Sequence, residues 1–300
     1  SSDLPTFAAL VAACRGPECP LSFLTFGNYS ATANLVPMAR VPYIQSLKLL
    51  ASADSVQGIK QHPYHDDFVS DRIEQMLATR NSKSSTLRNL PRQQRADSML
   101  YAAQLNSKSL SRITPHIPES IPKDPLSQQA EIALASFKAG VCVSANLTIG
   151  QFDSHQKNDE DQMKLLPRFL ASIDYLLRRA EDLQIREKLV LVIQSEMGRT
   201  PSYNNGDGKD HWSIGSIMFL GPGIRGNRTV GATDESQMPV PIDARSFSLG
   251  DQNGIRVRPE QIHVALRELA GINTHPFAKK FPFKVKESEM LTGLWDGQVL

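Results

Sequence analysis

The chain has 300 residues, of which 40% are hydrophobic and 21% are charged, with 33 basic and 31 acidic residues for a net charge of +2. These values are typical of a globular protein with a substantial core. The near balance of charge argues against nucleic acid or an anionic membrane surface as a partner. No apolar run approaches the roughly 18 residues that span a bilayer, so we expect no membrane span.

The first 80 residues favour short elements of mixed type. "LPTFAALVAAC" (4–14) has helical spacing, and "LSFLTFGN" (21–28) is a short apolar run that predicts a strand. Two further helices are predicted at 43–56 and 66–80. In the second helix an apolar face is formed by Ile73, Met76 and Leu77.

Residues 81–125 are rich in Ser, Arg, Lys and Pro, and we interpret them as an insertion rather than a separate domain. The second half of residues 81–110 can form a helix. Residues 112–125 contain four prolines, which predict a surface loop.

The second half of the chain alternates helices and strands. Helices are predicted at 126–139, stopped by Gly140, at 159–185 and at 259–271, and strands at 141–150, 188–195 and 213–224. "KLVLVIQS" (188–195) is almost continuously apolar, as in a parallel strand that is covered on both faces. The order predicts a single α/β domain over residues 1–300, with a doubly wound, mostly parallel sheet and helices on both faces.

Charged and imidazole groups follow two of these strands directly. Asp153 and His155 come after the strand at 141–150, and Glu196 and Arg199 come after the strand at 188–195. If the two strands are parallel, these groups emerge at one edge of the sheet, where ligands bind in open α/β folds. His211, about fifteen residues beyond Glu196, is near enough in sequence to fold back over that edge.

Two carboxylates and two imidazoles can hold a divalent ion such as zinc, or manganese with more oxygen ligands. Such an ion polarises an ester oxygen or lowers the pKa of a bound water. Zinc is our first choice, with manganese, calcium and magnesium as alternatives.

Each residue also has a simpler interpretation. Asp153 could cap the following helix, Glu196 could pair with Arg199, and "NNGDGKD" (204–210) could be a flexible turn. A second cluster, "HPYHDD" (62–67), could bind a metal, but Asp66 or Asp67 more simply caps the next helix.

Four ordered motifs resemble an uncharacterised bacterial family that is placed with the alkaline phosphatase and sulfatase superfamily. They are "FDSH" (152–155), "SEMGRTP" (195–201), "GKDHW" (208–212) and "GATDE" (231–235). Members typically carry Trp-Asp-Thr-His, Gly-Glu-Phe-Gly-Arg-Thr-Pro, Gly-Arg-Asp-His-Trp and Gly-Ala-Thr-Asp at these places. The resemblance covers roughly residues 140–245.

The resemblance implies an alkaline phosphatase-like core with a metal site at the strand ends. It implies that Arg199 and Lys209 bind the anionic group of a small phosphate or sulfate ester. Relatives are often exported, which implies a periplasmic location, with the cytoplasm as the alternative. By position, the implied metal ligands are Asp153, His155, Glu196 and His211.

The chain departs from the family pattern at its front. Superfamily enzymes open with a strand that ends in a metal-binding Asp and is followed by a nucleophile, whereas the first predicted strand here ends at Gly27 and Asn28. The nucleophile is therefore unassigned, and the first core strand could be missing. Two hypotheses follow: a metal-dependent hydrolase of phosphate or sulfate esters, or a degenerate relative that serves as a binding or scaffold module. The second includes a subunit of a larger assembly, with a protein partner or a second copy of the chain.

Cys14 and Cys19 enclose "RGPE", and Cys142 stands alone. The first two could form a small disulfide loop in an oxidising compartment or stay free thiols, and the sequence leaves both open.

Overall fold

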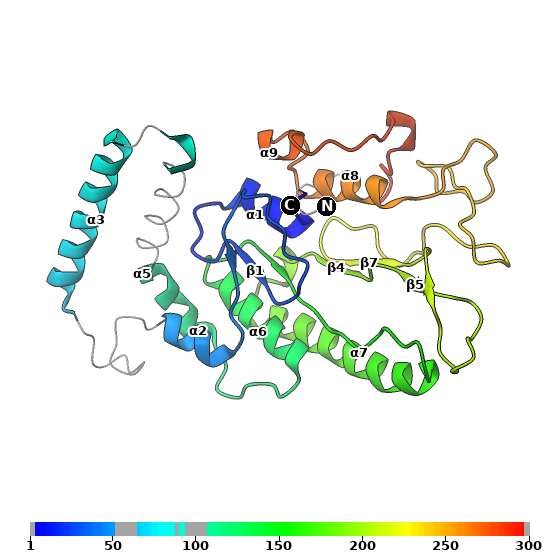
Figure 1. Ribbon diagram of the computed structural model, residues 1–300, viewed down its shortest axis with the longest axis horizontal. Coiled ribbons are helices and arrows are strands. Elements are labelled where there is room, and N and C mark those ends of the chain that lie inside the picture. The colour runs from blue at the N-terminus through cyan, green and yellow to red at the C-terminus, as the bar shows by residue number, and fades with distance from the viewer. Residues whose placement is uncertain (1–3, 52–64, 88–89, 94–106, 297–300) are drawn as a thin grey trace. The chain divides into compact units, whose positions relative to one another are not determined.

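The computed structural model describes residues 4–51, 65–87, 90–93 and 107–296, and these form two compact units, Ser1–Thr148 and Ile149–Leu300 (Figure 1). The fold is mixed α/β with a small parallel three-stranded sheet and helices. The predicted α/β class is confirmed, whereas the doubly wound alkaline phosphatase-like sheet is not. That residues 1–300 make one domain stays a prediction. Within the described residues, no helix is both long and apolar enough to cross a membrane.

The first unit contains the parallel sheet. Strand β1 (Phe23–Thr25) lies between β2 (Met38–Ala39) and β3 (Ser144–Asn146), and it runs parallel to both. All three residues of β1 are buried, as a central strand requires. The carboxyl ends of the three strands therefore lie at one edge of this sheet.

Several helical segments accompany this sheet in the described part of the unit. Thr6 caps the first, because its hydroxyl accepts a hydrogen bond from the Ala9 N–H at 3.2 Å. In Figure 1, α1 lies on one side of β1 and α6 on the other. The segments are α1 (Phe7–Arg15), α2 (Ile44–Ala51), α3 (Asp67–Leu87), α5 (Ser107–Leu110), η2 (Ser111–His116) and α6 (Pro125–Lys138).

The core of the first unit includes a residue that we expected in a surface loop. Ile113, in the 3₁₀ helix η2, is fully buried in one cluster with Leu24, Leu47 and Ile132. The prediction of a surface loop from residue 112 is therefore wrong at its start. The prolines do end the α-helical pattern, but one 3₁₀ turn is enough to point Ile113 inward.

The start of helix α3 shows the role of one residue in the histidine cluster at 62–67. The Val69 N–H donates to Asp66 Oδ1 at 2.8 Å, which confirms Asp66 as the helix cap. His62 lies outside the described residues. The helix continues to Leu87, into the predicted insertion, and Met76 on its predicted apolar face is exposed.

The second unit has a different strand arrangement from the one predicted. Strand β4 (Leu191–Gln194) pairs with β7 (Ile217–Leu220), and the pairing is antiparallel, with Leu191 opposite Leu220. The expected parallel neighbour of this strand, β3, belongs to another sheet. An apolar run of this length fits a half-buried antiparallel strand as well as a fully buried parallel one, and β4 is half-buried.

The second unit contains further helices and strands besides the β4–β7 pair. Trp295 packs edge-to-face on Phe219 of β7, and its indole N–H donates to the Ala265 carbonyl at 2.9 Å. The elements are α7 (Asn158–Asp182), η3 (Arg186–Lys188), β5 (Gly198–Arg199), β6 (His211–Trp212), α8 (Pro259–Leu269), α9 (Pro276–Lys279) and η4 (Glu287–Glu289).

Cys14, Cys19 and Cys142 form no disulfide in the structure, so no disulfide loop closes around "RGPE". Burial raises the pKa of the Cys142 thiol, and partial burial, helped by the nearby Glu18 carboxylate, raises the pKa of Cys19. Both thiols are therefore protonated at neutral pH and unreactive as nucleophiles.

Helix α2 allows a direct test of this core. Leu47 is fully buried, whereas Leu49, two residues further along the same helix, is 58% exposed. Leu47→Ala should lower the free energy of unfolding by about 2–5 kcal/mol, because it removes buried methyl groups and leaves a cavity. Leu49→Ala should change it by less than about 0.5 kcal/mol. Urea unfolding followed by circular dichroism measures both, and equal losses would contradict the core assignment.

Candidate metal centre

The segment after residue 150 presents two candidate ligands on one side. Ser154 is buried, and its hydroxyl donates to Asn158 Oδ1 at 2.8 Å and accepts from Gln162 Nε2 at 3.0 Å. Asp153 and His155, on either side of the buried Ser154, are both exposed to solvent. Asp153 is not a helix cap, since α7 begins at Asn158 with Lys157 in the capping position.

A two-stranded ribbon supplies the other side of the site. In the antiparallel pair β5–β6, Gly198 lies opposite Trp212 and Arg199 lies opposite His211. Directly opposed residues project to the same face of a ribbon, so Arg199 and His211 are neighbours. Gly198 is required here, because a Cβ on it would lie 1.9 Å from the Ile214 carbonyl oxygen.

The loop between β5 and β6 is held against the Asp153 segment by its own hydrogen bonds. Asn204 Oδ1 accepts from the N–H groups of Gly206 at 2.9 Å and Gly208 at 3.0 Å. Asn204 Nδ2 donates to the His155 carbonyl and to Asp210 Oδ1, both at 3.0 Å. The stretch 204–210 is therefore a loop held by hydrogen bonds and not the flexible turn considered above.

Three ligand atoms converge at the centre of this arrangement. Asp153 Oδ1 lies 3.1 Å from His155 Nε2 and 3.0 Å from His211 Nε2, and the two imidazole nitrogens are 3.1 Å apart. The side chains are 64%, 45% and 50% exposed in the order Asp153, His155, His211. Within the described residues, this is the group of three that could hold a metal ion.

Asp210 orients one of the two histidines. His155 Nδ1 lies 3.0 Å from Asp210 Oδ1, so this nitrogen carries the proton that the carboxylate accepts. In the neutral imidazole, Nε2 then presents its lone pair to Asp153 and His211. The hydrogen bond from His155, followed by that from Asn204, lowers the pKa of Asp210.

The three atoms fit a divalent ion. Ligands at the zinc–nitrogen distance of about 2.0 Å in a tetrahedral site lie about 3.3 Å apart, close to the observed separations. When His155 is neutral with its proton on Nδ1, the lone pairs of its Nε2 and of the Asp153 oxygen face each other at 3.1 Å. A cation removes this repulsion, and the carboxylate on Nδ1 of His155 is the usual outer partner of a metal-binding histidine.

Arg199 pairs with Asp153, not with Glu196. One guanidinium nitrogen donates to Asp153 Oδ1, and the other donates to the Lys209 carbonyl at 3.1 Å. The hydrogen bond from Arg199, with a second from His211, holds the pKa of Asp153 at about 2. Asp153 is therefore ionised over the whole range in which the protein would bind a metal.

Two of the predicted residues lie elsewhere. Glu196 is exposed and is not part of the three-residue group, so its role as fourth ligand stays a prediction. The Lys209 ammonium lies over the ring of Tyr203, 4.8 Å from its centroid. The Tyr203 hydroxyl in turn donates to Asp159 at 2.8 Å, which lowers the pKa of that carboxyl.

Our sequence reasoning gave no role to Asp210 or Asn204. A signal was present for the first, since Asp210 directly precedes His211 in "GKDHW". Its partner, however, is His155, and that pairing depends on how the loop folds back. Asn204 acts through four hydrogen bonds to nearby groups, which no residue pattern in the sequence indicates.

Comparison with known families shows to which family the chain belongs. The family described as "Protein of unknown function (DUF1501)" matches residues 38–279, and the chain belongs to this family. Neither a curated protein nor a solved structure matches it. The resemblance to the alkaline phosphatase and sulfatase superfamily is therefore wrong, because the family that matches is a distinct one of uncharacterised proteins.

The role of Asp210 in orienting His155 can be tested separately from the effect of its negative charge. Asp210→Asn should weaken zinc binding about 10–100-fold, because it replaces the charged carboxylate that orients His155 with a neutral amide. Asp207→Asn is the matched control: it removes one negative charge from the same loop, and Asn tolerates the positive φ of 54° there. Isothermal titration of zinc into the metal-free protein measures both, and equal effects would contradict the orienting role.

The ion pair with Arg199 predicts a pH dependence. Because the folded pKa of Asp153 is depressed to about 2, its contribution to stability is complete above the ordinary carboxyl pKa of about 3.9 and is lost as the pH falls towards 2. Arg199→Gln should raise the pKa of Asp153 in the metal-free protein. Carboxyl NMR titration measures this shift, and an unchanged pKa would contradict the pairing.

Proposed function

We propose that this member of the DUF1501 family is a metal-dependent hydrolase of phosphate or sulfate esters, with its ion held by Asp153, His155 and His211. The observation that carries the proposal is the triangle of ligand atoms with sides of 3.0–3.1 Å. Each of the three side chains is at least 45% exposed, so a substrate can reach an ion bound there.

Zinc fits the donor set best, since two imidazoles and one carboxylate are ligands that it commonly takes. Three protein ligands leave coordination positions free, which is typical of catalytic rather than structural sites. A bound ion would polarise an ester oxygen and lower the pKa of a coordinated water.

Arg199 is the protein group best placed to bind the anionic part of the ester. Its guanidinium is fixed by Asp153 on one side and by the Lys209 carbonyl on the other. Five N–H donors in a planar fork leave some that can bind two oxygens of a phosphate or sulfate group together. A fixed cation at this place stabilises the charge that builds up during in-line attack. Lys209 is proposed as a second, peripheral cation.

The hydroxyl groups near the site already have hydrogen-bond partners, which favours water as the attacking group. The Ser154 hydroxyl is buried and donates to Asn158, and the Thr200 hydroxyl donates to the Ser202 carbonyl at 2.9 Å. The Thr200 oxygen also accepts from the Asp210 N–H at 3.1 Å. Both hydroxyls therefore have structural partners. In the proposed reaction a water oxygen bonds to phosphorus or sulfur as the ester bond opposite it breaks.

The test uses the full chain, stripped of metal and reloaded with zinc. It should cleave para-nitrophenyl phosphate or para-nitrophenyl sulfate only when zinc is present. Asp153→Asn and His211→Ala should each lower the rate at least a hundredfold, because each removes a ligand. Arg199→Lys should lower turnover about 10²–10³-fold, as the loss of a preorganised charge donor does. Release of para-nitrophenol is the measurement.

His65→Ala is the control, since this histidine is exposed and lies in the other unit. Zinc-dependent cleavage that survives in both ligand variants would end the proposal. One equivalent of zinc without cleavage of either ester would favour the alternative, a metal-bearing binding or scaffold module.

A further inference from the structure

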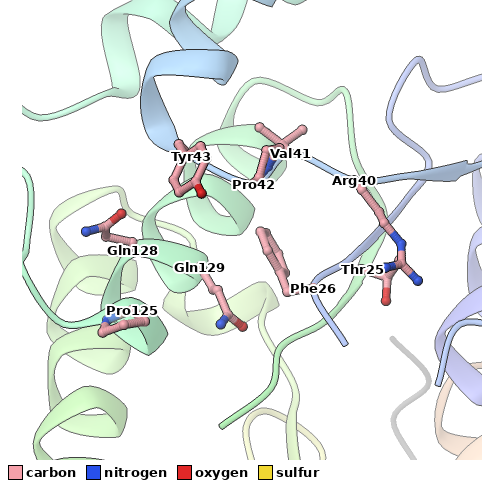
Figure 2. A pocket seen from close by; sticks show the side chains of 9 residues that line it. All are labelled: Thr25, Phe26, Arg40, Val41, Pro42, Tyr43, Pro125, Gln128 and Gln129. Atoms are coloured by element: carbon pink, nitrogen blue, oxygen red, sulfur yellow. The ribbon is translucent and has the colours of Figure 1, made fainter. Parts of the chain in front are cut away.

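A cleft of about 480 Å³ opens in the first unit, and none of its lining residues belongs to the candidate metal centre (Figure 2). It lies where the parallel strands end: Thr25 is the last residue of β1, Phe26 follows it, and Arg40 follows β2. The carboxyl edge of a parallel sheet is where α/β folds most often bind small molecules.

The lining of the cleft is largely apolar, with few polar groups. Gln129 is not available to a ligand, because its amide is bonded to the backbone of Thr148, donating to the carbonyl at 3.0 Å and accepting from the N–H at 2.8 Å. This leaves Thr25, Arg40, Gln128 and the Tyr43 hydroxyl as polar groups. The apolar part consists of Phe26, Val41, Pro42, Tyr43 and Pro125.

Arg40 makes the cleft positive, since it is the one charged residue of the nine described residues that line it. One of its N–H groups donates to Ser30 Oγ at 3.1 Å, which leaves others of its five donors for a ligand. Helix α6 also begins here, but its first turn is satisfied by Asp124, whose carboxylate accepts from the Ser127 N–H at 2.9 Å. The attraction for an anion therefore comes from Arg40 and not from the helix end.

Thr25 gives a second, independent sign of a ligand. It is 1% exposed, and its hydroxyl oxygen has no hydrogen-bond partner within the described part of the chain. A buried hydroxyl without a partner is costly and uncommon in folded proteins. Because Thr25 lines the cleft, a polar ligand atom at the cleft floor would supply the missing partner.

These groups are separated along the cleft. Figure 2 shows Arg40 and Thr25 at one end, Pro125 and Gln128 at the other, and the Phe26 ring between them. We propose that the cleft binds a small aromatic carboxylate, with its carboxylate at Arg40 and Thr25 and its ring against Phe26, Pro42 and Tyr43. Arginine binds carboxylates through paired N–H groups, and offset aromatic contacts hold a flat ring. The proposal is independent of the hydrolase activity.

Calorimetric titration of the full chain with naphthoate tests this. Naphthoate should bind with one site per chain, and Arg40→Gln should weaken it about tenfold or more, as loss of a charge-assisted pair does. Naphthalene methanol has the same ring without the charge, and its binding should change less than about twofold in Arg40→Gln. Thr25→Val keeps the side-chain shape and should weaken naphthoate severalfold.

Lys48→Gln is the charge-matched control, because Lys48 is exposed on α2 and does not line the cleft. It should leave naphthoate binding unchanged. Arg40 is also exposed, so its variant keeps the fold and the test stays decisive even if Thr25→Val is poorly folded. Absence of naphthoate binding, or equal binding by the native chain and Arg40→Gln, would overturn the proposal.

Discussion

The close approach of two backbone segments at Gly208 is the constraint on which the candidate metal centre depends. A Cβ at this position would lie 2.0 Å from the carbonyl carbon and oxygen of His155, so no other residue fits without separating the segments. The contact brings the loop before β6 against the segment that carries Asp153 and His155. His211 reaches Asp153 as a result. The Lys209 N–H donates to the Ser154 carbonyl at 3.0 Å and stabilises the same contact.

The charges around this contact explain why the site would take a cation first and an anion second. Asp153 and Asp210 are ionised, Arg199 is positive, and histidines that bind a metal are neutral. The formal sum is two negative charges and one positive, or −1. A divalent ion changes the sum to +1, which attracts a phosphate or sulfate ester. Arg199 lessens the attraction for the ion, but it holds the carboxylate ionised and in place.

The longer helices of the described chain were largely predictable, because apolar spacing marks them in the sequence. Thr6 and Asp124 cap α1 and α6, and Gly140, at a φ of 70°, ends α6 as expected. The strand partners were not predictable. "KLVLVIQS" is apolar enough for either a parallel or an antiparallel neighbour. The antiparallel pairing with β7 depends on how the chain between β4 and β7 folds.

The same limit explains why Asp153, His155 and His211 were selected by an argument that the structure does not support. We expected them to meet at the edge of a parallel sheet, but they meet through the β5–β6 ribbon and the close contact at Gly208. Glu196 was selected by the sheet-edge argument and by the resemblance, and it is the residue outside the group. The edge rule does apply to the sheet that the protein has. There it places Thr25 and Arg40, which no charge cluster in the sequence indicates, in the lining of the cleft shown in Figure 2.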